Sequence, residues 1–100
     1  MPQLRPRVKI VLIGGGSQSW SPFIIRDIVC KEGMAQVDLT LTLLDVHQGR
    51  AEAIQRLFAA KLAEWGMDWA RVETVDDRRE ALTGADIVLT YWAAEVARWI

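Results

Sequence analysis

The stretch "KIVLIGGGSQSWSPFI", Lys9–Ile24, decides the fold of this 100-residue chain. Five residues of strand-forming character lead directly into three glycines and a serine, and a proline-led apolar segment follows. A continuous apolar run that ends at glycine predicts a buried strand over Val8–Ile13. The apolar rhythm after the turn predicts a helix over Pro22–Lys31, which Gly33 ends. The stretch therefore predicts a strand, a glycine turn and a helix in succession.

Strands and helices alternate along the rest of the chain. The pattern predicts strands over Val37–Asp45, Ala70–Val75 and Ile87–Thr90, a long helix over Arg50–Trp65 capped by Gly66, and a short helix opened by Asp77 and Glu80 and ended by Gly84. Alternation of this kind produces parallel strands joined by right-handed helical crossovers. The predicted fold class is α/β, a Rossmann-like parallel sheet in the order β-α-β-α-β-α-β. We expect residues 1–100 to form one domain that is the N-terminal portion of a larger one.

Composition excludes several functional classes. The 12 Lys and Arg residues and 13 Asp and Glu residues give a net charge of −1 with no basic run, so we expect no nucleic-acid partner and no membrane partner. The single cysteine, Cys30, excludes an intrachain disulfide and a zinc site with two thiolates, and we interpret it as a packed thiol. The apolar run near the N-terminus is too short for a signal peptide. These features favour a cytoplasmic protein.

The glycine turn is a candidate phosphate site. A helix N-terminus leaves unpaired N–H groups and a partial positive charge directed at the turn before it. Gly14 permits the tight turn, Gly16 has no Cβ to keep a diphosphate from the backbone, and the Ser17 hydroxyl can cap the helix or bind a phosphate oxygen. Ser19 stands where the pattern G-x-G-x-x-G has its third glycine. A P-loop is excluded, because no Gly-Lys-Ser/Thr follows the glycines.

Asp45, at the end of the second predicted strand, is the acidic partner of that turn. A carboxylate there can accept hydrogen bonds from both hydroxyls of an adenine ribose and repels a 2′-phosphate, which favours NAD over NADP. The alternative is an ordinary turn aspartate that caps the next helix. The nucleotide hypothesis makes two demands on the structure: Asp45 must lie beside the glycine turn, and amides in that turn must not be satisfied by the protein itself.

Pro22 constrains how the first helix begins. If Ser17 capped the helix, Pro22 would fall past the first turn, where its ring and missing N–H disrupt the hydrogen-bond ladder. Ser21 as N-cap with Pro22 at the first helical position is better local chemistry. We therefore predict an irregular or tightened turn over Ser17–Trp20 and regular helix only after Pro22.

Several motifs together resemble glycoside hydrolase family 4 over about Val8–Thr90. They are "KIVLIGGGS" followed by Trp20 and Asp27, "LTLLDVHQGRAE", and "DDRREALTGADIVLT". The spacing from Ser17 to Trp20 and Asp27 is similar to the α-glucosidase, α-galactosidase and α-glucuronidase branch. Pro22 is a loose counterpart of the Tyr-Thr-Pro signature of the 6-phospho-glycosidase branch, so the branch stays open.

The resemblance implies an NAD- and divalent-metal-dependent hydrolase, with manganese the usual metal. Such enzymes oxidise the sugar at C3, remove the acidified C2 proton, eliminate the aglycone, add water and reduce C3 again. The family's metal ligands and its catalytic acid and base lie beyond its first hundred residues, so none maps onto this chain. The resemblance implies six cofactor-binding residues: Gly14, Gly16, Ser17 and Asp45, with Thr90 and Tyr91 lining the cofactor groove.

Three functions follow as hypotheses. The first is the NAD-binding portion of a family 4-type glycosidase, whose full-length parent acts on a small-molecule sugar glycoside in carbohydrate metabolism and forms a homo-oligomer. The second is the NAD-binding half of a 2-hydroxy-acid dehydrogenase of the lactate/malate type, because those enzymes share the glycine turn, the acid and the "GADIV" strand. The third is a non-catalytic nucleotide-binding or interaction module. His47 is interpreted as a solvated turn residue, and the amphipathic tail "WAAEVARWI" predicts a fragment or a domain that meets another surface.

Overall fold

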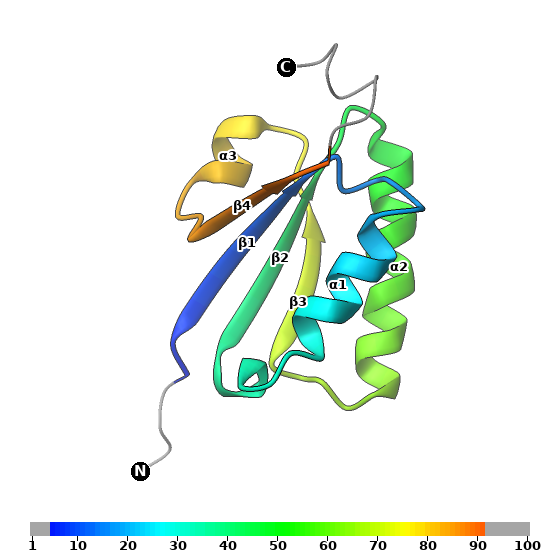
Figure 1. Ribbon diagram of the computed structural model, residues 1–100. Coiled ribbons are helices and arrows are strands. Elements are labelled where there is room, and N and C mark those ends of the chain that lie inside the picture. Colours follow the sequence, from blue (N-terminus) through cyan, green and yellow to red (C-terminus); the bar gives the residue numbers. More distant parts are fainter. Residues whose placement is uncertain (1–4, 92–100) are drawn as a thin grey trace.

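The computed structural model describes residues 5–91, and the predicted amphipathic tail lies outside them. Strands and helices alternate along the chain as the sequence predicts (Figure 1). In order they are β1 (Arg7–Ile13), α1 (Ser21–Val29), the 3-10 turn η1 (Met34–Gln36), β2 (Asp38–Leu44), α2 (Gln48–Glu64), β3 (Ala70–Thr74), α3 (Arg78–Leu82) and β4 (Ile87–Thr90).

The four strands form one parallel sheet in the order β3-β2-β1-β4. Strand β1 occupies the middle, with Ile13 opposite Leu44 of β2 on one side and Thr90 of β4 on the other. This order matches the first half of a doubly wound sheet, β3-β2-β1, with the first strand of the second half, β4, added beside β1, where the direction of winding reverses. The predicted Rossmann-like α/β fold is confirmed.

Helices cover both faces of the sheet, which gives two apolar clusters. On one face α1 and α2 pack against alternate residues of β1, β2 and β3, and this is the main core (Figure 1). Its fully buried residues include Leu12, Leu41 and Ile25. On the other face the short helix α3 places Ala81 against Val11 and Leu44. The alternation follows from the period of two in a strand, which sends successive side chains to opposite faces.

Helix α2 packs on the sheet through a narrow stripe of side chains. The buried residues are Ala51, Ile54, Phe58 and Leu62, which follow the i, i+3, i+4 spacing of one helix face. Leu57 and Trp65 are apolar residues that the same spacing would place on this face, yet they are 43% and 40% exposed. The Lys61 ammonium lies 5.6 Å from the centroid of the Trp65 ring. The helix therefore meets the sheet along one line of side chains, and its flanking apolar residues lie at the margin.

The start of α1 differs from the prediction. Trp20 is the N-cap position, without a side-chain capping bond, and Ser21 is already helical, with Pro22 in the first turn. The predicted irregular turn over Ser17–Trp20 is present, because regular helix starts only at Ser21. The Ser21 hydroxyl does not cap the helix. It is completely buried and donates to the Gly15 carbonyl at 2.6 Å, a partner that no nearby sequence signal reveals.

Other local predictions have mixed outcomes. Asp77 caps α3 by accepting a hydrogen bond from the Arg79 amide at 3.2 Å, as expected of an aspartate at this position. Gly66 and Gly84 follow α2 and α3 with φ of +71° and +73°, the left-handed conformation that glycine adopts most readily. The interpretation of Cys30 as a packed thiol is wrong. This residue is the C-cap of α1, beyond the face that packs on the sheet, and it is exposed.

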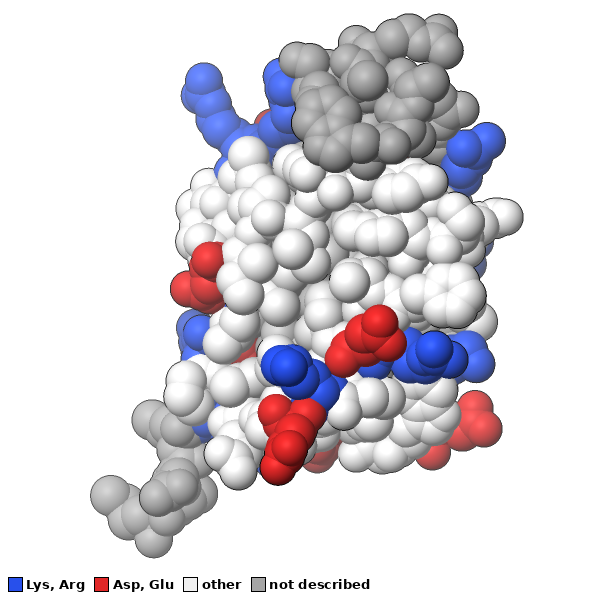
Figure 2. Space-filling model, in the orientation of Figure 1, with Lys and Arg blue, Asp and Glu red and all other residues white. Residues whose placement is uncertain are grey.

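The described surface carries mixed charges and one apolar edge. On the face seen in Figure 2, side chains of both signs gather toward one end and the margins, around a broad uncharged area. Ile87 and Val88 of the edge strand β4 are 45% and 44% exposed. Among the described residues, no helix is long and apolar enough to cross a membrane.

The packing of the central strands predicts a large stability difference between two leucines. Leu41 of β2 is fully buried, whereas Leu57 of α2 is 43% exposed. We expect Leu41→Ala to lower the free energy of unfolding by about 2–5 kcal/mol, because it removes buried methyl groups and leaves a cavity. The control, Leu57→Ala, should cost less than about 1 kcal/mol. Urea denaturation followed by circular dichroism measures both, and equal losses would contradict the assigned core.

Candidate functional site

The six residues predicted to bind a cofactor all lie at the carboxyl edge of the sheet. The glycine turn follows β1, Asp45 follows β2, and Thr90 and Tyr91 lie at the end of β4 (Figure 1). Because β1 stands between β2 and β4, this edge includes the point where the winding of the sheet reverses. Ligands of open α/β sheets bind in the crevice at that point.

Asp45 lies directly beside the glycine turn. Its Oδ2 accepts a hydrogen bond from the Gly16 amide at 2.8 Å, and its Oδ1 accepts one from the His47 amide at 2.8 Å. Each carboxylate oxygen has two lone pairs, so the partly exposed Asp45 keeps acceptor capacity for a further ligand. Asp45 therefore lies beside the glycine turn, as the nucleotide hypothesis requires. Asp45 also binds the start of α2, because it accepts the hydrogen bond from the His47 amide.

The amides of the glycine turn are largely satisfied by the protein itself. Gly14 and Gly15 donate to the Leu44 carbonyl at 2.8 and 3.3 Å, and Ser17 donates to the Gly14 carbonyl at 3.1 Å. Together with the Gly16 bond to Asp45, this engages all the amides from position 14 to position 17. The nucleotide hypothesis also requires amides that the protein does not satisfy, and these occur only further along the turn. There, the exposed amides of Gln18 and Ser19 have no acceptor within residues 5–91.

The structure shows why each of the three positions in the turn, 14 to 16, is occupied by glycine. Gly14 has φ of +83°, which residues with a Cβ rarely adopt. A Cβ at Gly16 would lie 2.9 Å from Asp45 Oδ2, and a Cβ at Gly15 would lie 2.9 Å from the Leu12 carbonyl. The φ of Gly14 and the close packing at Gly16 already explain why glycine stands at these two positions. These glycines are therefore no evidence for a bound diphosphate, and contact with one stays a prediction.

Ser21 and Trp20 are two contributors that the sequence analysis did not place in the site. Ser21 joins α1 to the glycine turn through its bond to Gly15. Trp20 stacks on Tyr91, with ring centroids 5.4 Å apart and planes 16° apart, so it connects the turn to the end of β4. The Tyr91 amide donates to the Ile13 carbonyl at 3.0 Å, which fixes Tyr91 to the end of β1. In the sequence, the only signal for the contact between Trp20 and Tyr91 is the position of an aromatic residue, Trp20, shortly after the glycine turn.

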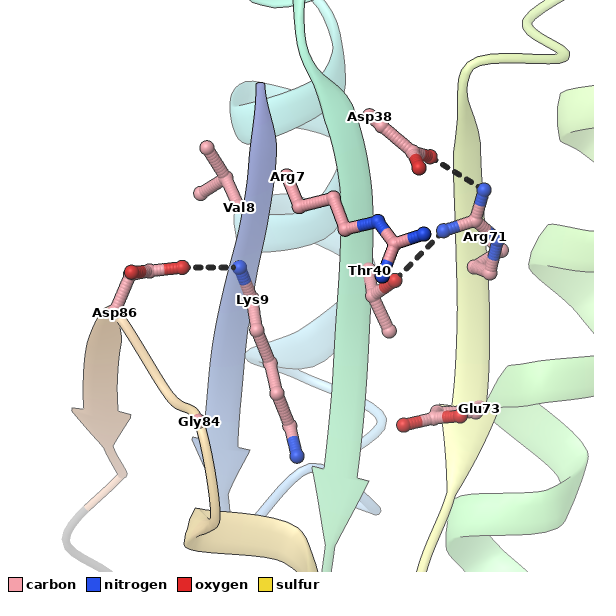
Figure 3. Close-up of a pocket in the computed structure, with 9 residues that line it drawn as sticks. All are labelled: Arg7, Val8, Lys9, Asp38, Thr40, Arg71, Glu73, Gly84 and Asp86. Atoms are coloured by element: carbon pink, nitrogen blue, oxygen red, sulfur yellow. Dashed lines mark hydrogen bonds and ion pairs between the residues drawn. The ribbon is translucent and has the colours of Figure 1, made fainter. Parts of the chain in front are cut away.

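A separate pocket of about 670 Å³ lies at the opposite, amino end of the strands (Figure 3). Several of its charged groups already have partners. Arg71 binds Asp38 and the Thr40 hydroxyl, and Asp86 accepts from the Lys9 amide at 2.8 Å. None of the predicted site residues lines this pocket. Most of these contacts join side chains or backbone of neighbouring strands on the sheet surface. The glycine turn therefore remains the candidate site.

The part of the chain that the structure describes offers no place for a metal ion. Within residues 5–91, no group of three or more histidine, cysteine, aspartate or glutamate side chains could hold one. His47, the single histidine, is exposed at the start of α2. The divalent metal implied by the family resemblance therefore does not fit these residues, and no chemistry is assigned to it here.

Comparisons with known proteins point to one family. A family model described as "Family 4 glycosyl hydrolase" matches residues 9–95. No curated protein matches the chain.

Two similar solved structures are both phosphoglucosidases. A 6-phospho-alpha-glucosidase from gut microorganisms, in complex with NAD and glucose-6-phosphate, is 21% identical with a TM-score of 0.72 over 88% of this chain and 19% of that one. The 6-phospho-beta glucosidase from Thermotoga maritima is 19% identical with a TM-score of 0.70 over 85% of this chain and 20% of that one. The chain thus spans about a fifth of either structure. At these identities the likeness establishes the fold.

The buried Ser21 hydroxyl predicts a specific stability defect. We expect Ser21→Ala to lower the free energy of unfolding by about 1–3 kcal/mol, because the Gly15 carbonyl loses its partner in a buried position. The matched control is Ser19→Ala, since Ser19 is exposed in the same turn. Thermal and urea denaturation measure both variants. A Ser21→Ala protein as stable as Ser19→Ala would show that the bond to Gly15 does not hold the turn.

Proposed function

This chain belongs to the family 4 glycosyl hydrolases, and we propose that it is the NAD-binding portion of a glycosidase of that family. The observation that carries the proposal is the placement of Asp45. Its carboxylate, at the end of β2, lies 2.8 Å from the Gly16 amide in the turn after β1, at the edge where such sheets bind dinucleotides. The complex of one structural neighbour with NAD supports the same cofactor.

The residues at this edge fit NAD. Asp45 has acceptor capacity left for the two hydroxyls of the adenosine ribose, and its negative charge disfavours the 2′-phosphate of NADP. The amides of Gln18 and Ser19 are the available donors for the diphosphate, with the partly exposed Ser17 hydroxyl beside them. Thr90 and Tyr91, at the end of β4 on the other side of β1, are the residues that we propose to line the cofactor groove. In this proposal the Asp45 carboxylate accepts hydrogen bonds from the ribose, and the amides of Gln18 and Ser19 donate hydrogen bonds to the diphosphate.

The reaction we propose for the full-length enzyme is cleavage of a glycosidic bond by redox and elimination. When bound, NAD⁺ would supply the hydride acceptor for C3 of the sugar and would give the hydride back at the end. In between, the C2 proton, acidified by the C3 ketone, is removed, the aglycone leaves and water adds to the unsaturated sugar. The net change is hydrolysis. The residues of this chain hold the cofactor and do not touch the bond that breaks.

The remaining parts of the proposal concern the full-length protein. We propose a divalent metal, manganese, whose ligands lie outside this chain together with the catalytic acid and base. The substrate is a sugar glycoside, the assembly a homo-oligomer, and the location the cytoplasm, with no nucleic-acid or membrane partner. Both structural neighbours are named as phosphoglucosidases, which supports a glucoside substrate without deciding between phosphorylated and free sugar.

The two other hypotheses predict different behaviour. A 2-hydroxy-acid dehydrogenase of the lactate/malate type would share the NAD site, but the family match over residues 9–95 favours the glycosidase. A non-catalytic nucleotide-binding or interaction module would catalyse no turnover even in the full-length protein. Measured NAD binding that depends on Asp45 separates a nucleotide-binding chain from an interaction module, and glycosidase turnover by the full-length protein separates the enzyme portion from a non-catalytic nucleotide-binding module.

We expect Asp45→Ala to weaken NAD binding at least about tenfold, because hydrogen bonds to a charged group are worth about 1.5–3 kcal/mol. Isothermal titration calorimetry of the chain with NAD and with NADP measures the affinities, and the unchanged protein should prefer NAD. Asp76→Ala is the matched control, since Asp76 is an exposed carboxylate following β3 at the same edge. Equal losses in the two variants, or no loss in Asp45→Ala, would refute the proposed ribose contact.

The 100-residue chain by itself should bind NAD and catalyse no glycosidase turnover, because its described residues hold neither a metal site nor a catalytic acid–base pair of the family. Hydrolysis of a nitrophenyl glycoside, followed by absorbance with NAD and manganese added, tests this expectation. A preparation shown by calorimetry to bind NAD is the appropriate sample. Release of nitrophenol above the protein-free rate would contradict the division of roles.

A further inference from the structure

Stacking of Trp20 on Tyr91 places a second aromatic ring beside a residue that we propose for the cofactor groove. We propose that the Trp20–Tyr91 stack recognises the nicotinamide ring in its oxidised, cationic form and makes the site bind NAD⁺ more tightly than NADH. The inference rests on the proposed NAD binding and names the residues that would receive the reactive half of the cofactor.

The strand order determines which half of the cofactor reaches the stack. Asp45 follows β2, the glycine turn follows β1 and Tyr91 follows β4, and these three strands are neighbours in that order. Neighbouring strands lie about 4.8 Å apart, so the three points form a row across the sheet edge. A dinucleotide with its adenosine ribose at Asp45 and its diphosphate at the turn must extend its second half toward the end of β4. That half carries the nicotinamide.

The stack is held in place from both sides. The Tyr91 amide is bonded to the Ile13 carbonyl at 3.0 Å, and the Trp20 amide is bonded to the Ser17 hydroxyl at 3.2 Å. The Trp20 carbonyl accepts from the Ile24 amide at 3.0 Å, in the first turn of α1. Trp20 also packs against the main core. The two rings are therefore positioned by the backbone of β1, α1 and the turn.

The geometry of the pair excludes insertion of a ligand between its rings. The centroids are 5.4 Å apart, whereas an inserted ring needs about 7 Å, twice the contact distance of about 3.5 Å between carbon atoms. Trp20 and Tyr91 are each partly exposed, so a ligand can meet the outer surface of the pair. The pair thus offers an aromatic wall at the end of β4.

The chemistry of that wall discriminates between the two redox states. The face of an aromatic ring carries the negative part of its quadrupole, and tryptophan is the strongest cation–π partner among the side chains. Oxidised nicotinamide is a pyridinium cation, whereas reduced nicotinamide is neutral. Both forms gain apolar contact from the wall, and the oxidised form alone gains the electrostatic attraction. The stack therefore selects by charge, while Asp45 and the turn bind the part of the molecule that the two forms share.

Such a preference suits a reaction that is redox-neutral overall. The cofactor must be oxidised when a sugar arrives and is oxidised again when the product leaves. A tenfold preference for NAD⁺ shifts the two-electron potential of the bound cofactor by about 30 mV, because binding and reduction are linked. The resting enzyme then keeps the form that begins a turnover.

The test compares three ligands on the full chain by isothermal titration calorimetry: NAD⁺, NADH and ADP-ribose, which lacks nicotinamide. We expect Trp20→Leu to weaken NAD⁺ binding about threefold to tenfold, to weaken NADH binding less than about twofold, and to leave ADP-ribose binding unchanged. Leucine keeps apolar packing and removes the ring. Trp65→Leu is the matched control, because Trp65 lies at the far end of α2 and should change none of the three affinities.

The outcomes separate this inference from the proposed function. Equal weakening of all three ligands would show that Trp20 only holds the turn, and no change in any would place the stack outside the site; either result overturns the inference while NAD binding stands. Failure of the unchanged protein to bind NAD⁺ would overturn the proposed function together with it. If circular dichroism shows that Trp20→Leu does not fold, Tyr91→Leu makes the same comparison.

Discussion

The hydrogen bond from the Gly16 amide to the Asp45 carboxylate is the contact on which the arrangement of the site depends. It joins the turn after β1 to the end of β2 across a distance of 2.8 Å, and it exists because parallel pairing sets Ile13 opposite Leu44, immediately before the two segments. A Cβ at position 16 would lie as close to the carboxylate as the amide does, at 2.9 Å. Glycine at this position and aspartate at the strand end are therefore one structural unit, although 29 residues separate them along the chain.

This contact also changes how the turn can serve an anion. A glycine turn is usually considered attractive to phosphate because its amides are unpaired, yet here the first four amides have acceptors in the protein, and one of those acceptors is a carboxylate. The structure separates the two tasks. Asp45 is oriented by two amides and is the acceptor that we propose for the ribose diol, whereas the donors that we propose for phosphate lie further along the turn, at Gln18 and Ser19. A rigid acceptor beside separate donors matches a ligand that alternates sugar and diphosphate.

Membership of the family gives this small sheet its place in a larger protein. The chain corresponds to about a fifth of the solved structures it resembles, and that fifth includes the edge of the sheet proposed to receive NAD. The described residues hold no group of side chains that could bind a metal ion, and the pocket at the amino end of the strands includes the ion pair of Arg71 with Asp38. Our proposal therefore assigns the cofactor and the sugar chemistry to different parts of the polypeptide. Within this part, the Trp20–Tyr91 stack is the feature that we propose for the reactive half of the cofactor.

The sequence by itself determined the order of the elements, their bounds to within one or two residues, the caps at Gly66, Gly84 and Asp77, and the pairing of a glycine turn with Asp45. These features depend on periodicity and on neighbours within a few positions, which a single sequence displays directly. Tertiary structure alone decided that the glycine amides are occupied, that Ser21 binds Gly15 and does not cap its helix, that Leu57 and Cys30 are exposed, and that Trp20 meets Tyr91. Most of these depend on how the strands and helices are placed beside one another. Trp20 and Tyr91 are far apart in the sequence, and only the position of β4 next to β1 brings their rings together.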